Sequence, residues 1–414
     1  MEFDYAGWLT SPFILMSAAV FTGVILGRLK IGRFSLGISG TLFTGLVIGW
    51  FIYQRYALPY EGTSDAPGYA AHMLKYGVVH IDFFYLFLIL FVAAVGLLAA
   101  RDLGAVLRKY GGKFIILGFI ITLTGAVVTY LMALASPGQN PFAVTGVYTG
   151  ALTSSPGLGA AIETVAKYGR EAEAAVGAGY AIGYPFGVLV VIIAVNFIPV
   201  VFGIDLEAEK EIFRREMAEA RAAAGTREIP EVSFDIAGFV LTIITGYTIG
   251  SMRIYMGPLG YFSLGSTGGV LIGALVLGYI GEIGGIHFRM SNKILGVIRQ
   301  VSLAFFLCIV GLRYGFGVFD ALASGGAYLA LVSLLVGIAA ILAGYLVGRH
   351  LFGINWIMLS GSICGGMTST PGLGVAIDAV GSDDPAAGYG AVYPFALLGM
   401  VMFTILLHRL PVNL

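Results

Sequence analysis

A polar, glycine-rich phrase occurs twice in this otherwise apolar chain, as TSSPGLGAAIE at 153–163 and as TSTPGLGVAID at 368–378. Hydroxyl residues of this kind cap helix N-termini, and proline is tolerated in the first turn of a helix. A helix that begins at such a phrase presents free backbone N–H groups and the positive end of its dipole, which together bind anions. The phrase therefore predicts two helix ends that can hold a carboxylate.

Both copies supply the same kinds of residue to this predicted anion site. The prolines are expected to stop the incoming helix, and the glycines allow close approach of backbone to backbone or ligand. A second interpretation is that each phrase only makes a tight turn, but two copies in register favour a site. The predicted substrate-binding residues of the two phrases are Thr153, Ser154, Ser155, Pro156, Gly157, Thr368, Ser369, Thr370, Pro371 and Gly372.

Three more residues are candidates for the substrate site. Arg313 lies late in an apolar segment, where an arginine is costly and often functional. It either pairs with a substrate carboxylate or extends its guanidinium to the membrane interface. Tyr184 and Tyr393 each precede a proline in the last segment of their half, and they either line the site or pack in the core.

Glu163 and Asp378 form a candidate ion-coupling pair, because they occupy matching positions after the two phrases. Acidic side chains within a membrane can carry a coupling proton or bind Na⁺ through their oxygens. The alternative is a structural contact between each phrase's outgoing helix and its scaffold.

The composition places the chain in a membrane. Of its 414 residues 58% are hydrophobic and 11% are charged, whereas a soluble domain is about 25% charged. Zero net charge suggests no nucleic-acid partner, and no Walker A, HExxH or nucleophile–base arrangement indicates an enzyme. Cys308 and Cys364 lack metal-ligand or CxxC spacing and are expected to be small buried hydrophobic residues, so no metal or cofactor is predicted.

Apolar segments of roughly the 20 residues that span a bilayer recur along the chain, which predicts an all-α polytopic membrane protein. Between the halves, the charge-rich stretch 203–233 is expected to be a hydrophilic linker with a polar helix in its middle. This divides the chain into a first repeat at 1–202, the linker, and a second repeat at 234–414. The predicted segments are 12–29, 35–56, 82–100, 114–135, 143–167, 176–201, 235–254, 262–281, 296–316, 327–348, 355–380 and 387–409.

Sequence matches in the same order on both sides of the linker indicate an internal duplication. Each repeat contains about five spans and one odd segment that carries the phrase. Besides the phrase, the matching stretches are 34–49 with 262–278, 91–98 with 306–313, and GYAIGYPF at 179–186 with GYGAVYPF at 388–395.

The distribution of Lys and Arg predicts the orientation. Basic residues, including Arg33 and Arg101, follow the first and third spans, which places those loops in the cytoplasm and the N-terminus outside. With a cytoplasmic linker, 143–167 must enter and leave on the same side as a re-entrant hairpin. The second repeat is then inverted, and its hairpin at 355–380 enters from the other face. If 143–167 is instead a true span, the repeats are parallel.

At these phrases the chain resembles the aspartate–alanine exchanger family of bacterial membrane transporters, which has duplicated membrane halves. The resemblance implies a protein of the inner membrane that exchanges an acidic amino acid or dicarboxylate for a smaller amino acid. It also implies a homodimer in which the hairpin-bearing region moves like an elevator against a scaffold. Many members carry two soluble regulatory domains between the halves, where this chain has only 203–233.

Inverted repeats with broken, Gly/Pro-interrupted segments are typical of secondary transporters, whose sites lie near the bilayer midplane. We therefore expect a transporter that exchanges small carboxylates or amino acids, with the substrate held between the two hairpin tips. The alternative is a Na⁺- or H⁺-coupled symporter of dicarboxylates or acidic amino acids. A channel is less suited to two opposed hairpins, because a selectivity filter needs rings of ligands around an axis.

Overall fold

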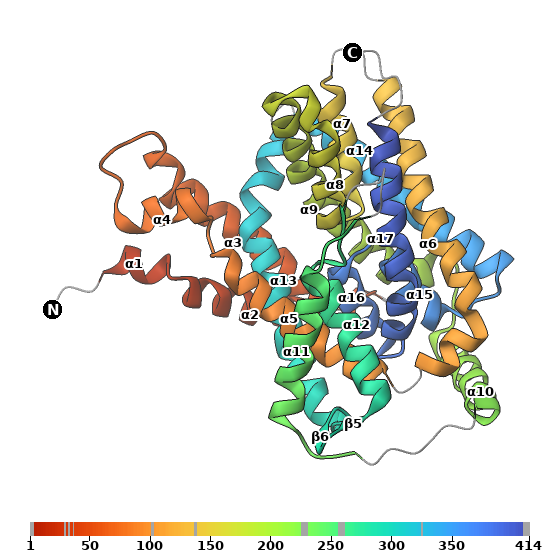
Figure 1. Cartoon of the computed structure of the whole chain (residues 1–414). Coiled ribbons are helices and arrows are strands. Elements are labelled where there is room, and N and C mark those ends of the chain that lie inside the picture. Colours follow the sequence, from red (N-terminus) through yellow and green to blue (C-terminus); the bar gives the residue numbers. More distant parts are fainter. Residues whose placement is uncertain are drawn as a thin grey trace. The chain divides into compact units, whose positions relative to one another are not determined.

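The computed structural model describes residues 4–28, 30–31, 34–35, 37–100, 103–135, 139–224, 231–255, 261–323 and 326–408. These residues are predominantly helical (Figure 1). They divide into two compact units, which we describe separately. Unit 1 comprises Met1–Phe91 and Ile298–Gly326, and unit 2 comprises Val92–Val297 and Ala327–Leu414. Arg33 and Arg101, used above for the orientation, lie outside the described residues.

The helices of the first half are α1 (Tyr5–Leu9), α2 (Pro12–Gly27), α3 (Gly40–Tyr56), α4 (Gly68–Tyr76), α5 (Ile81–Ala99), α6 (Leu103–Leu134), α7 (Pro141–Ala151), α8 (Ser155–Val165) and α9 (Arg170–Val201). Helix α10 (Leu206–Ala224) follows. The second half contains α11 (Ile236–Ser251), α12 (Gly265–Ile280), α13 (Asn292–Ala323), α14 (Ala327–Leu346), η5 (Val347–Leu351), α15 (Trp356–Gly366), α16 (Thr370–Val380) and α17 (Pro385–Leu407).

Short antiparallel ladders join some of these helices. They pair β1 (Lys30–Ile31) with β2 (Phe34–Ser35), β3 (Ile254–Tyr255) with β4 (Tyr261–Phe262), and β5 (Glu282–Ile283) with β6 (Ile286–His287).

Six described helices are long and apolar enough to cross a membrane: α5, α6, α9, α13, α14 and α17. In each half two of these long helices come first, the two short helices of a hairpin follow, and the third long helix comes last, which agrees with a duplicated sequence. The predicted spans at 35–56 and 262–281 begin late as helices, because glycines stand near their starts with φ angles of +51° at Gly37 and +72° at Gly265. The segments 143–167 and 355–380 each form two helices of 11 residues rather than one. A helix of that length is about 16 Å long, too short to span a bilayer.

The same glycine-dependent crossing occurs in each unit. In unit 1, α2 meets the turn that precedes α3, and a Cβ on Gly27 would lie 1.8 Å from the carbonyl oxygen of Gly37. In unit 2, α11 meets the start of α12, and a Cβ on Gly250 would lie 2.2 Å from the carbonyl oxygen of Gly265. Side chains at these positions would prevent the backbones from approaching, so both repeats need glycine for the same reason.

Unit 2 contains both helical hairpins. Helix α7 packs on α9, and its counterpart α15 packs on α17. A Cβ on Gly179 of α9 would lie 2.0 Å from the carbonyl oxygen of Ala143 in α7. Likewise, a Cβ on Gly361 of α15 would lie 1.7 Å from the carbonyl oxygen of Pro385 in α17. The first helix of each hairpin is thus held against the last helix of its own half by direct backbone contact.

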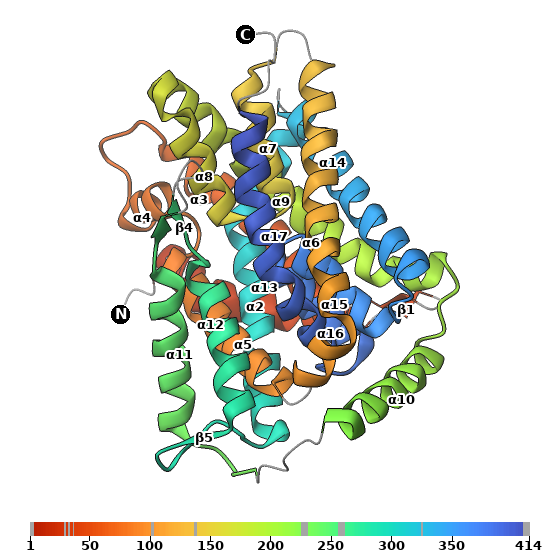
Figure 2. The ribbon, with the colours of Figure 1, turned by 45° about the vertical axis from the view of Figure 1, so that its right-hand side comes forward.

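The predicted polar helix of the linker is α10, and it packs on α6 and α15 within unit 2. Figure 2 shows α10 running beside the lower ends of these helices.

We expect Gly179→Ala to lower the melting temperature of the detergent-solubilised protein by several degrees. The added methyl group would overlap the Ala143 carbonyl, and overpacking of this kind costs about 1–3 kcal/mol. Gly177→Ala in the same helix is the control, because a Cβ there meets no atom within 4 Å. Alanine favours helix by up to about 1 kcal/mol over glycine, so Gly177→Ala should leave the melting temperature unchanged or raise it. Equal effects of the two substitutions would contradict the described crossing.

Candidate functional site

The two hairpins meet tip to tip in unit 2. Hairpin 1 consists of α7, the turn 152–154 and α8, and hairpin 2 consists of α15, the turn 367–369 and α16. In both ribbon views hairpin 1 lies above hairpin 2 (Figures 1 and 2). The Thr153 hydroxyl donates to the carbonyl oxygen of Met367 at 3.2 Å, and the Thr368 hydroxyl donates to that of Leu152 at 2.7 Å.

These two bonds are reciprocal, because each joins the first threonine of one phrase to the residue immediately before the other phrase. A two-fold relation between two like elements produces contacts of this kind. Each bond also satisfies a carbonyl at the C-terminus of α7 or α15, where the helix itself offers no donor. The tips are therefore joined through groups that each hairpin leaves unpaired.

The turning residue of each tip is a threonine in the left-handed region, with φ angles of 53° at Thr153 and 49° at Thr368. Among the described residues these are the only ones other than glycine with positive φ. The N–H of Ser154 bonds the Thr149 carbonyl and the N–H of Ser369 bonds the Cys364 carbonyl, each at 2.8 Å. This helix ending usually has glycine at the left-handed position, and a β-branched residue there costs on the order of 1–3 kcal/mol.

The expectation that proline stops each incoming helix is wrong. Helices α7 and α15 end at Ala151 and Gly366, before the turning threonines, and the prolines stand in the first turns of the outgoing helices. The physical reason is that a left-handed residue already ends the helical hydrogen-bond pattern. Proline then fits a position whose N–H has no partner within the helix.

The predicted N-caps are confirmed at one residue in each phrase. Ser154 accepts a hydrogen bond from the N–H of Gly157 at 3.1 Å, and Ser369 accepts one from the N–H of Gly372 at 3.2 Å. Gly372 also lies against α9, because a Cβ there would come within 2.1 Å of Val191 Cγ1. The serines thus start α8 and α16, and glycine keeps the second tip close to its neighbouring helix.

A pair of tyrosines of α17 lies beside Thr370, the first residue of α16. The hydroxyls of Thr370 and Tyr389 are 3.2 Å apart, and the Tyr389 ring stacks on Tyr393 with centroids separated by 5.3 Å. The matching residues of the first half, Tyr180 and Tyr184, form a tilted pair at 5.5 Å. Sequence reasoning selected Tyr184 and Tyr393 but missed their partners, although each partner is four residues earlier and so lies on the same helix face.

The other candidates are placed as follows. Arg313 lies in unit 1, where its guanidinium donates to the carbonyl oxygens of Tyr76, at 3.0 Å, and of Val79. Asp378 is half-buried on α16. The side chains of Ser155, Pro156 and Glu163, all in α8, lie outside the described residues.

An asparagine starts each hairpin, which sequence reasoning also missed. Asn140 accepts from the N–H of Phe142 at 2.9 Å, and Asn355 accepts from the N–H of Met358 at 3.0 Å. Both stand immediately before the first helical residue, a signal that the sequence carries. On hairpin 1, Thr145 is also 3.0 Å from a ring nitrogen of His408, which is buried.

Among the described residues no cluster of His, Cys, Asp or Glu is arranged to hold a metal ion. Cys308 and Cys364 are buried and free, as expected for small hydrophobic residues.

Comparison with known proteins places this architecture in a family. The Asp-Al_Ex model, described as a predicted permease membrane region, matches residues 15–200 and 238–409. An uncharacterized transporter of Bacteroides thetaiotaomicron is 36% identical over 169 residues, which are 41% of this chain and 32% of that relative. An uncharacterized transporter of Desulfotalea psychrophila is 30% identical over 175 residues, 42% of this chain and 32% of the relative.

A putative transport protein of Pectobacterium atrosepticum is 36% identical over 141 residues, 34% of this chain and 26% of the relative. The matched stretch spans about a third or less of the length of these curated relatives. The family model, by contrast, covers most of the present chain and both of its halves. The chain therefore belongs to the Asp-Al_Ex family of predicted permease membrane regions.

Proposed function

We propose that the protein is a secondary active transporter that exchanges small carboxylates or amino acids, such as aspartate and alanine. The substrate is held between the tips of hairpin 1 and hairpin 2 and is exposed alternately to the two sides of the membrane. The observation that carries this proposal is the reciprocal contact of Thr153 with Met367 and of Thr368 with Leu152. It brings the N-termini of α8 and α16 to one place.

Counting the first N–H groups of these helices shows what each tip offers a ligand. In both α8 and α16 the second residue is proline, which has no N–H. The third N–H donates to the hydroxyl of the cap serine, and the fourth N–H donates to the carbonyl oxygen of the same serine. Among the described bonds, this leaves the first N–H, that of Ser155 in α8 and of Thr370 in α16. Both lie at the positive end of a helix dipole, which favours a carboxylate.

The contact between the tips can open at small cost. A neutral hydrogen bond contributes only about 0.5–1.5 kcal/mol net. The two threonine hydroxyls therefore act chiefly to align the tips, while the backbone N–H groups contact the substrate.

The remaining features of the transporter are proposed from the charge pattern and the family resemblance. The N-terminus lies outside the bacterial inner membrane, α10 lies in the cytoplasm, and the two repeats are inverted. The protein forms a homodimer, and unit 2, which carries both hairpins, moves like an elevator. Ion coupling through Glu163 and Asp378 and a substrate role for Arg313 remain predictions.

Replacing Thr153 separates the role of its hydroxyl from that of its strain. Thr153→Gly removes the hydroxyl and relieves the left-handed strain, so we expect an unchanged or raised melting temperature and substrate affinity lower by about fivefold. That loss corresponds to one hydrogen bond of about 1 kcal/mol. Thr153→Ser keeps the hydroxyl and should keep the affinity. Wild-type affinity in the glycine variant, measured by ligand binding in detergent, would count against the alignment role.

The transport reaction is tested by uptake of labelled aspartate into proteoliposomes that contain alanine, aspartate, succinate or buffer, with and without a Na⁺ or pH gradient. We expect uptake only when a counter-substrate is inside, because exchange requires the site to return loaded. Uptake into empty vesicles driven by an ion gradient would show a symporter instead. Absence of uptake under every condition would contradict transport of acidic amino acids.

A further inference from the structure

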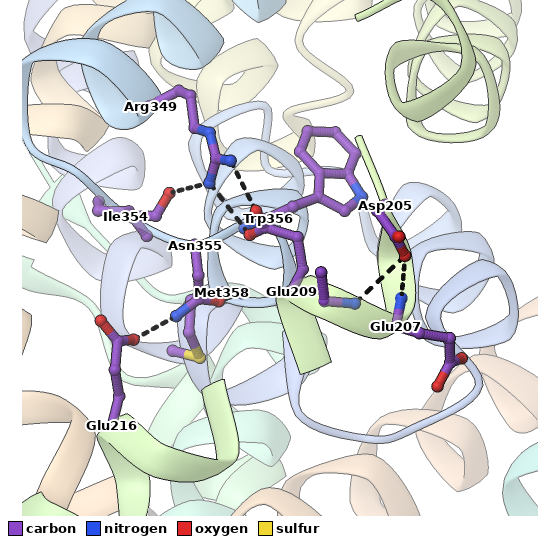
Figure 3. Close-up of polar contacts among 10 residues, drawn as sticks. Asp205, Glu207, Glu209, Glu216, Arg349, Ile354, Asn355, Trp356 and Met358 are labelled. Carbon is purple, nitrogen blue, oxygen red and sulfur yellow. Dashed lines mark hydrogen bonds and ion pairs between the residues drawn. The ribbon is translucent and has the colours of Figure 1, made fainter. Parts of the chain in front are cut away.

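Helix α10 covers the base of hairpin 2, the end of the hairpin away from its tip. In Figure 3, Glu209 and Glu216 of α10 point toward Arg349, Asn355 and Trp356. We propose that Glu209 and Glu216 are positioning residues, which clamp the start of α15 and so pre-organise hairpin 2 for substrate. This inference rests on the proposed function only for its effect on transport, because the clamp itself is a structural claim.

Glu209 makes the more buried half of the clamp. One of its carboxylate oxygens accepts from the backbone N–H of Trp356 at 2.6 Å and from Arg349 Nη1 at 3.0 Å. The other oxygen is 2.6 Å from Arg349 Nη2. Trp356 is the first residue of α15, so the carboxylate lies at the positive end of that helix dipole and satisfies an N–H that has no acceptor within the helix. Glu209 is only 4% exposed, and a buried charge needs such a set of partners.

Glu216 makes the second half of the clamp, two helical turns further on and on the same face of α10. Its Oε2 accepts from Asn355 Nδ2 at 2.6 Å and from the Tyr110 hydroxyl at 2.5 Å, and its Oε1 is 3.0 Å from Lys109 Nζ. The Asn355 amide must present Nδ2 to this carboxylate, so its Oδ1 faces the N–H of Met358 and caps α15. Glu216 therefore orients the cap of hairpin 2 and ties it to α6.

Among the described residues, the corresponding cap of hairpin 1 is not covered in this way. Asn140 and Asn355 cap α7 and α15 in the same way, yet Asn140 is exposed whereas Asn355 is 2% exposed. The family match also stops at residue 200 and resumes at 238, so α10 lies outside the region common to the family. The two hairpins therefore differ at their bases, because the described contacts place α10 against the base of hairpin 2.

The test uses the same substitution at both caps, read by hydrogen exchange of the full-length protein in nanodiscs. Aspartate caps helices as well as asparagine does, so Asn140→Asp should leave exchange in α7 and α8 unchanged. Asn355→Asp places a second carboxylate against Glu216 and removes the Nδ2 donor. We expect amide exchange in α15 and α16 to become about tenfold faster, the change expected for loss of a hydrogen bond to a charged group. Combining Asn355→Asp with Glu216→Gln should restore slow exchange, because the amide can donate to the new carboxylate.

Glu209→Gln tests the other half of the clamp, since it keeps an acceptor for Trp356 but loses the ion pair with Arg349. It should also speed exchange in α15 and α16, whereas Glu211→Gln should not, because the Glu211 side chain is 75% exposed on the same helix. In proteoliposomes the two clamp variants, Asn355→Asp and Glu209→Gln, should raise the KM for substrate about tenfold. The maximal rate should stay within about twofold, because fewer molecules have a binding-competent hairpin 2.

Equal exchange in the Asn355→Asp, Asn140→Asp and unmodified proteins, or equal effects of Glu209→Gln and Glu211→Gln, would overturn the clamp. A lowered maximal rate with unchanged KM would overturn its role in pre-organising the site. Selective loosening of hairpin 2 in a protein that transports no carboxylate would support the clamp and contradict the proposed function instead.

Discussion

The reciprocal contact of the hairpin tips is the constraint on which the rest of unit 2 depends. Leu152 and Met367 are both 0% exposed, so their carbonyls at the ends of α7 and α15 need partners. Each tip supplies the donor for the other, and this requires threonine in the left-handed region, where glycine would be easier but has no hydroxyl. The strain of each left-handed threonine is thus offset by the hydrogen bond that its hydroxyl makes to the other hairpin. In the structure, each hairpin therefore satisfies a carbonyl at the tip of the other.

The packing around the tips follows from this contact. Each hairpin is short, so its first helix must lie directly against the last helix of its half, and glycines at Gly179 and Gly361 permit that approach. Glycine also permits close backbone contact where α2 meets α3 and where α11 meets α12. Since helices in a membrane gain little from apolar burial against each other, close backbone packing is the available source of stability.

The two halves are equivalent at the tips but not at the bases of the hairpins. Helix α10 adds two carboxylates to the start of α15 and none to the start of α7 in the described contacts. Buried ion pairs such as that of Glu209 with Arg349 often contribute more to a defined geometry than to stability. Helix α10, part of the stretch expected to be a hydrophilic linker, therefore packs against the start of hairpin 2.

The sequence by itself determined the features that depend on local hydrogen bonding and on the length of apolar runs. These include the helical segments, the two hairpins, the capping role of Ser154 and Ser369, and the polar helix at α10. Tertiary structure decided the features that depend on partners distant in the chain. Only the fold joins Thr153 to Met367, Tyr389 to Thr370, and Glu209 to Arg349. Tertiary structure also decides that each incoming helix ends before a left-handed threonine and not at the proline. The hydroxyl of that threonine donates to a carbonyl of the opposite hairpin, and no local sequence pattern can show such a contact.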